Sequence, residues 1–288
     1  MKKQFRAVPF LLILIILFTA CQERKISPIK GSLKCYVDES LLNLVTVERD
    51  SFVERYPGSK IELVSAKARE GIAAVLNKEA DIFISSRNLN DEERIFFDKS
   101  ESTMRGFKFC YDAVVPIVNE KDLKDQITLD EIKDLLSGKT RNYALFVPEH
   151  NSGVYEYLKE KFKELKELKN ISIVKSEEEA IQKIKQKNRS ISFVGINTLQ
   201  NVKGIKTLDV GVVRSKDDIL YFKPYVAYLI GQTYPLTRTT TIFINEIGIG
   251  LASGFSTFLT SYEGQKIVSN YNLGPATVPV KMVELNRR

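Results

Sequence analysis

The sequence predicts an α/β protein with two domains joined by two extended crossover strands. Predicted strands and helices alternate along the chain in the manner of βαβ units. A long extended run at 107–118 contains Pro116, which is typical of an edge strand or of a crossover between domains. The 288 residues suffice for two domains after an N-terminal signal segment is set aside.

Apolar periodicity places the elements of the first half of the chain. Leu33, Cys35 and Val37 alternate, as they do in a half-buried strand. The helix that follows is stopped by Pro57 and Gly58. Strands are expected at 32–37, 60–64 and 81–84, and helices at 41–56 and 71–77.

Helix caps predict where helices begin in the second half of the chain. Thr128 with Glu131 forms a capping box that starts a helix ending at Gly138, and Ser176 with Glu179 starts another. The segment 248–271 predicts one helix or two, with Gly264 marking a break. The other elements expected are strands at 143–147 and 191–196, a charged helix at 155–169 and a second crossover at 222–228.

The amino terminus predicts export. Residues 1–6 are basic, residues 10–18 are apolar, and Thr19-Ala20-Cys21 follows. The apolar run is shorter than the about 20 residues of a transmembrane helix. The segment resembles a bacterial lipobox, although Phe18 stands where leucine is usual. We expect a signal peptide at 1–21, acylation of Cys21 and a tether at 22–30; the alternative is an ordinary secretory signal or an uncleaved anchor.

Composition narrows the function classes. The apolar fraction of 43% and the formal charge of +7 describe an ordinary globular chain without an aromatic-interleaved basic patch, so we expect no nucleic-acid partner. His150 is the only histidine and no Cys-x-x-Cys pair occurs, so we expect no metal and no cofactor. Cys35 and Cys110 are expected to be buried free thiols, with a single bridge between them left open.

Four predicted loops carry a serine between a strand and the start of a helix. Unpaired backbone N–H groups and the helix dipole favour an anion at such a place, and a serine hydroxyl adds a donor. For each serine alone, plain helix capping is the competing interpretation. The four are Ser40, Ser65, Ser86 and Ser152.

Affinity arithmetic shows what such a site needs. Micromolar binding takes about 8 kcal/mol, whereas a helix terminus contributes roughly 0.3–2 kcal/mol. Charge-assisted hydrogen bonds, at about 1.5–3 kcal/mol each, must therefore carry most of the binding. Arg87, Lys67 and Arg69 are the candidates to supply the positive charge.

Several runs of this sequence resemble the phosphate-binding lipoproteins that serve ABC importers. The run ADIFISSR at 80–87 is similar to the segment that lines their oxyanion cleft. The runs FVGINTLQ, YPLTRTTTIFIN, GFSTFLTSYEGQKIV and LGPATVPVKMVEL follow in the order in which similar runs occur in that family.

This resemblance implies a type II periplasmic binding protein fold. It implies a discontinuous domain 1 at 31–111 and 226–288 and a domain 2 at 112–225, a monomer, and a location on the outer side of a membrane. The ligand-binding residues that it implies are Ser40, Leu41, Ser65, Ser86, Arg87, Ser152, Gly153 and Val154.

The sequence also departs from the family pattern. Ser86 stands where well-studied members carry an aspartate that accepts the proton of monohydrogen phosphate, and Pro148 is the nearest match to a site arginine. With Ser86 there, we expect weaker discrimination between phosphate and sulfate. The alternative is that Asp38, Glu39 or Glu70 takes over the acceptor role.

The sequence leaves three function classes to consider. The first is a non-enzymatic protein that captures phosphate for an ABC permease. The second is an envelope phosphatase or other hydrolase. The sequence disfavours it, because it has no nucleotide-binding glycine loop and no Gly-x-Ser-x-Gly elbow. The third is a related surface lipoprotein that binds sulfate or molybdate, or that serves sensing or adhesion.

Overall fold

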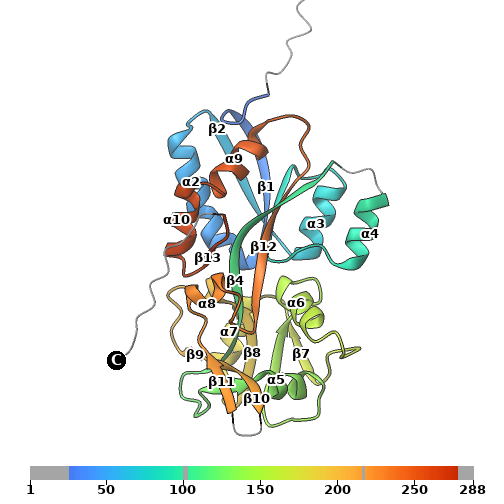
Figure 1. Cartoon of the computed structure of the whole chain (residues 1–288), viewed down its shortest axis with the longest axis vertical. Helices are drawn as coiled ribbons and strands as arrows, with labels where there is room; N and C mark the ends of the chain where they lie inside the picture. Colours follow the sequence, from blue (N-terminus) through green and yellow to red (C-terminus); the bar gives the residue numbers. More distant parts are fainter. Residues whose placement is uncertain (1–25, 100–102, 216–217, 278–288) are drawn as a thin grey trace, which may run out of the picture.

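The computed structural model describes residues 26–99, 103–215 and 218–277. Two lobes lie one above the other, and two strands run alongside each other from one lobe toward the other (Figure 1). The predicted signal peptide, with its acylation site at Cys21, lies outside the described residues. Within the described residues, no helix is both long and apolar enough to cross a membrane.

Lobe 1 is built on the β2-β1-β3-β12-β4 part of the main sheet. Strands β1 and β3 run parallel to each other, so their carboxyl ends reach the same edge of the sheet. The elements of lobe 1 are β1 (Gly31–Asp38), η1 (Glu39–Leu41), α2 (Leu42–Arg55), β2 (Ser59–Ala66), α3 (Ala68–Leu76), β3 (Ile82–Ser85), α4 (Asp91–Lys99), β12 (Thr237–Ile244), α9 (Leu251–Leu259), α10 (Tyr262–Asn270) and β13 (Gly274–Pro275).

Lobe 2 continues the same sheet through β4-β8-β6-β7 and adds a three-stranded sheet in the order β11-β10-β5. Its elements are β5 (Gln126–Thr128), α5 (Leu129–Leu136), β6 (Ala144–Pro148), α6 (Gly153–Lys161), β7 (Ile171–Val174), α7 (Glu177–Gln186), β8 (Ser190–Gly195), η2 (Ile196–Leu199), β9 (Ile205–Thr207), β10 (Asp209–Ser215), β11 (Asp218–Phe222) and α8 (Val226–Ile230).

Strand β4 (Arg105–Asn119) is the first connection between the lobes, as the extended run around Pro116 predicts. Its first half pairs with β12 and its second half pairs with β8. The expected second crossover at 222–228 is wrong, because β11 ends at Phe222 and α8 begins at Val226. The second strand that runs between the lobes is β12. It was not predicted as a strand because its threonine-rich start shows no apolar alternation.

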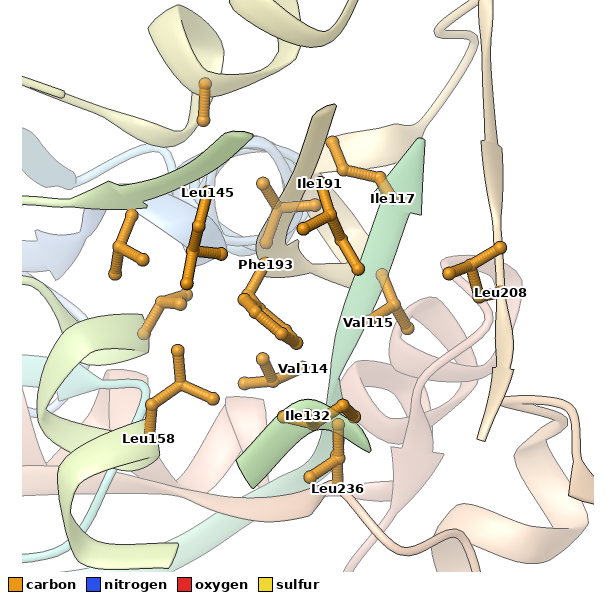
Figure 2. Packing of buried hydrophobic residues seen from close by; sticks show 14 of the residues in the cluster. Val114, Val115, Ile117, Ile132, Leu145, Leu158, Ile191, Phe193, Leu208 and Leu236 are labelled. Atoms are coloured by element: carbon orange, nitrogen blue, oxygen red, sulfur yellow. The ribbon is translucent and has the colours of Figure 1, made fainter. Parts of the chain in front are cut away.

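Each lobe has its own hydrophobic core. In lobe 2, apolar side chains of β4 and β8 pack with those of α5 and α6, and Phe193 lies among Leu145, Val114 and Val115 (Figure 2). In lobe 1, Phe52 of α2 packs edge-on against Phe255 and Phe258 of α9. Cys35 and Cys110 are both buried in this core as free thiols, as expected.

Two helix boundaries differ from the sequence expectation. Helix α6 ends at Lys161, because Phe162 leaves the helical conformation and is buried. The segment 248–271 forms two helices, but they separate at Thr260 and Ser261, where the Ser261 hydroxyl accepts from the N–H of Gly264. The capping box of Thr128 and Glu131 and the cap at Ser176 are confirmed.

Candidate functional site

Buried polar side chains of lobe 1 meet those of the two strands that run between the lobes. We call Asp38, Ser40, Ser86, Asp112 and Arg238 the interlobe cluster. Asp38 ends β1, Ser40 lies in η1, and Ser86 follows β3. Asp112 and Arg238 face each other across the paired strands β4 and β12. The parallel order of β1 and β3 explains why their loops open at the same place.

Arg238 is the buried cation of this cluster, with 3% of its surface exposed. Its Nε lies 2.8 Å and its Nη2 2.6 Å from Oδ2 of Asp112. Nη2 also donates to the Ser40 hydroxyl at 3.0 Å. Burial works to lower the pKa of Arg238, but Asp112, Glu177 and Asp38 raise it overall, so the guanidinium stays charged.

One nitrogen of this guanidinium has N–H groups that are not hydrogen-bonded within the described part of the chain. Nη1 of Arg238 is buried and has no hydrogen-bond partner among the described residues. A buried charged donor without a partner costs more than a neutral one. Nη1 can therefore bind an additional acceptor, and an oxyanion supplies acceptors of the right charge.

Lobe 2 contributes the amino terminus of α6. Ser152 is fully buried, and its hydroxyl accepts from the N–H of Tyr155 at 3.1 Å. Gly153 and Val154 are the first residues of this helix, and both are buried. A side chain on Gly153 would clash, because its Cβ would lie 1.8 Å from Oγ of Ser86. Glycine is required here because the two lobes touch at this point.

A buried acid of lobe 2, Glu177, interacts electrostatically with Arg238. Glu177 begins α7, and its Oε2 accepts from the N–H of Gly195 and the hydroxyl of Thr198, both at 2.7 Å. Burial raises the pKa of Glu177 to about 8, against the lowering effect of Arg238. A Cβ on Gly195 would lie 2.8 Å from Nη2 of Arg238, so the absence of a side chain lets this backbone approach the guanidinium.

The three cations expected from the sequence are already paired with acids. Arg87 Nη1 and Nη2 bind the two oxygens of Glu93 at 2.7 and 2.8 Å. Lys67 Nζ binds Glu39 at 2.7 Å, the carbonyl of Lys175 at 2.6 Å and Glu149 at 3.2 Å, so it links the lobes. Arg69 forms an exposed pair with Glu92.

The remaining predicted ligand-binding residues lie as follows. Leu41 is fully buried where η1 meets α2, so only its backbone is available for a ligand. Ser65 is exposed on β2, and no hydrogen bond found among the described residues joins its hydroxyl to the interlobe cluster. The structure thus gathers Ser40, Ser86 and the start of α6, and leaves Ser65 and the Arg87 guanidinium outside.

Three residues of the candidate site were not identified from the sequence. Arg238 lies within the quoted run YPLTRTTTIFIN, where a lone arginine in a strand that becomes apolar was a usable signal. Asp112 offered the same kind of signal between Tyr111 and Ala113 in a buried strand. Glu177 reads as an ordinary first-turn acid, because three consecutive glutamates start α7.

Metal chemistry has no support in the part of the chain that the structure describes. There, no group of three or more histidine, cysteine, aspartate or glutamate side chains is arranged to hold an ion. Burial strongly raises the pKa values of the two described cysteines. What the cluster offers is hydrogen bonding and charge.

Comparisons with known proteins place the chain in a family. A family model described as a PBP superfamily domain matches residues 27–263. The phosphate-binding protein PstS of Staphylococcus saprophyticus is 24% identical over 231 residues, covering 73% of this chain and 69% of that protein. PstS of Staphylococcus aureus strain USA300 is 21% identical over 239 residues, covering 76% and 70%.

Solved structures show the same fold. A candidate phosphate ABC transporter substrate-binding protein from Clostridium perfringens, solved with bound phosphate, superposes with a TM-score of 0.74 at 19% identity, covering 85% of this chain and all of that one. PstS from Borrelia burgdorferi gives a TM-score of 0.55 at 22% identity, covering 85% and 99%. The chain has the type II periplasmic binding protein fold and belongs to the PBP superfamily.

Proposed function

We propose that this protein captures phosphate between its two lobes and delivers it to an ABC importer. The observation that carries the proposal is the buried Arg238 guanidinium, whose Nη1 lacks a partner among the described residues. The similarity to phosphate-binding relatives supports the same ligand. The role is binding and release, without a chemical reaction.

Two lobes joined by two strands suit this role, because hinge motion exposes or encloses a site between them. We propose that the two lobes correspond to the two predicted domains, except that the chain returns to domain 1 at β12 and not at residue 226, because Leu229, Tyr234 and Leu236 pack in the lobe 2 core. We also propose that the protein works as a monomer and that acylated Cys21 holds it on the outer face of a membrane. Replacing Cys21 with serine should release the protein to the soluble fraction or block its processing. Unchanged fractionation and processing would disprove the anchor.

The three acids considered for the acceptor role differ in whether they contact Ser86. Glu39 binds Lys67, and Glu70 lies in the first turn of α3, where its Oε2 faces the N–H of Lys67. Asp38 alone among the three candidates contacts Ser86, whose hydroxyl donates to its Oδ2 at 2.8 Å. We therefore propose that Ser86→Asp weakens phosphate binding, because two carboxylates would face each other.

Calorimetry with phosphate, sulfate and molybdate tests the ligand. We expect phosphate to bind and to raise the melting temperature, with stabilisation of about 2.7 kcal/mol at a hundred times the dissociation constant. Because Ser86 replaces an acceptor, sulfate should bind within about tenfold of phosphate. A shift with molybdate or sulfate and none with phosphate would transfer the function to that oxyanion.

A further inference from the structure

The Asp38 carboxylate occupies the donors that the interlobe cluster would offer to an anion. Its Oδ1 accepts from the N–H of Ser40 at 3.1 Å and from the Ser40 hydroxyl at 2.7 Å. Its Oδ2 accepts from the Ser86 hydroxyl at 2.8 Å. The residue is 1% exposed. A carboxylate is itself an oxyanion, so these three bonds are of the kind that a phosphate oxygen would receive.

Lobe 2 closes directly on this carboxylate. A Cβ built on Gly153 would lie 2.9 Å from Oδ2 of Asp38, so the first turn of α6 packs against the Asp38–Ser86 pair. Helix α6 has nine residues, and the positive end of its dipole points to a place where Asp38 supplies negative charge. The carboxylate thus bonds to donors of lobe 1 and lies against the first turn of α6 in lobe 2.

Two further links keep the lobes in this position. Nδ2 of Asn197, in η2 of lobe 2, donates to the Ser40 carbonyl at 2.7 Å. Lys67 of lobe 1 donates to the Lys175 carbonyl at 2.6 Å and pairs with Glu149. Both links join residues of lobe 1 directly to residues of lobe 2.

We propose that Asp38 is an internal oxyanion: its carboxylate holds the lobes closed and competes with an external anion for Ser40, Ser86 and the start of α6. The competition rests on the proposed function, whereas the closing role does not. An external anion gains these donors only as Asp38 leaves them. Asp38 is therefore expected to set the affinity of the site by opposing binding.

Interlobe distances test the closing role in the absence of added anion. Spin labels attached through Glu79→Cys and Lys163→Cys, in the full-length chain that also carries Cys21→Ser, would report the separation of the lobes. Both positions are exposed, and the remaining native cysteines, Cys35 and Cys110, are buried. In phosphate-free buffer, the parent should give one narrow distance distribution. Asp38→Ala should give a broader distribution reaching longer distances, and Asp38→Asn should give an intermediate one.

A matched control is Asp50→Ala, which removes an exposed carboxylate from α2 and should leave the distribution unchanged. Far-ultraviolet circular dichroism of all variants checks that the fold is retained. A distribution for Asp38→Ala and Asp38→Asn that equals the parent's would overturn the proposal.

Phosphate calorimetry on the same variants tests the competition. Asp38→Ala should bind phosphate at least tenfold more tightly than the parent. If the parent binds phosphate and Asp38→Ala binds it more weakly, Asp38 is a ligand-binding acceptor and the proposal is overturned, while the proposed function stands. If no variant binds phosphate, sulfate or molybdate but Asp38→Ala still opens, the closing role is supported and the proposed function fails.

Discussion

Arg238 and Arg87 are both buried arginines near the ends of strands β12 and β3, yet their guanidinium groups leave different nitrogens without a hydrogen-bond partner in the part of the chain that the structure describes. Arg87 uses Nη1 and Nη2 in a two-pronged pair with Glu93, six residues along the same chain segment. Arg238 uses Nε and Nη2 on Asp112, and its Nη1 has no partner among the described residues. Nε of Arg87 also lacks a partner among the described residues, but both of its terminal nitrogens are taken by Glu93. The pair across two strands instead leaves a terminal nitrogen of Arg238 able to bind a ligand.

The comparison also explains which parts of the site could be predicted from the sequence. Ser40, Ser86 and Ser152 follow strands and precede helices, a local pattern that periodicity reveals. Whether an arginine is already paired depends on which acid the fold brings to it. Glu93 is close to Arg87 in sequence, but a glutamate there also reads as an ordinary first-turn residue of α4.

The prediction of strands from the sequence was limited in the same way. Strands with clear alternation, such as β1 and β3, were predicted within about a residue of their observed limits. The second crossover was misplaced because β12 begins Thr-Arg-Thr-Thr-Thr, which carries no apolar alternation until Ile242. Its strand character is set by pairing with β3 and β4, and this pairing is not visible in local sequence.

The largest expected effect comes from removing Arg238. In Arg238→Met, Asp112 would remain fully buried without its cation, which should cost about 3–5 kcal/mol in the free energy of unfolding. Phosphate binding should be lost as well. Urea unfolding and calorimetry measure the two effects. The double variant with Asp112→Asn should recover part of the stability but none of the binding, and recovered binding would contradict the role of Arg238.

Arg87→Met sharpens the comparison. Glu93 would lose its partner, but it lies in the first turn of α4, where the helix dipole favours a carboxylate. We therefore expect a smaller loss of about 2 kcal/mol in urea unfolding. Phosphate affinity should stay within about twofold of the parent. A loss of binding comparable to that of Arg238→Met would erase the distinction between the two arginines.

Glu48 is the opposite case, a buried acid without a cation. Both carboxyl oxygens lack hydrogen-bond partners among the described residues, and burial raises the pKa to about 9. Because the folded pKa exceeds the unfolded one, the folded state holds the extra proton, and stability falls as pH rises from about 4.5 to about 9. The slope from this group approaches about 1.4 kcal/mol per pH unit.

Glu48→Gln tests this assignment. The variant has no proton to lose, so its stability should depend less on pH than that of the parent, with the largest gain over the parent near pH 9. Urea unfolding at pH 6, 7 and 8 measures the difference. Parallel stability profiles for the two proteins would show that Glu48 does not titrate in this range.

The smallest effect is expected for Lys67→Met. Lys67 pairs with Glu39, whose pKa is raised to about 7 by burial despite the lowering effect of Lys67. Without the lysine, Glu39 can take up a proton near neutral pH, so the loss should be about 1 kcal/mol. The loss should grow above pH 8, where an unpaired Glu39 must ionise. Thermal melts at pH 6 and pH 9 check both the size and the sign.

A crystal structure of the protein grown with phosphate tests the central claim most directly. We predict a phosphate between the lobes with one oxygen about 3 Å from Nη1 of Arg238, the Arg87–Glu93 pair intact, and the Asp38 carboxylate displaced from Ser86. Phosphate bound at Arg87, or between the lobes without contact to Arg238, would contradict the account.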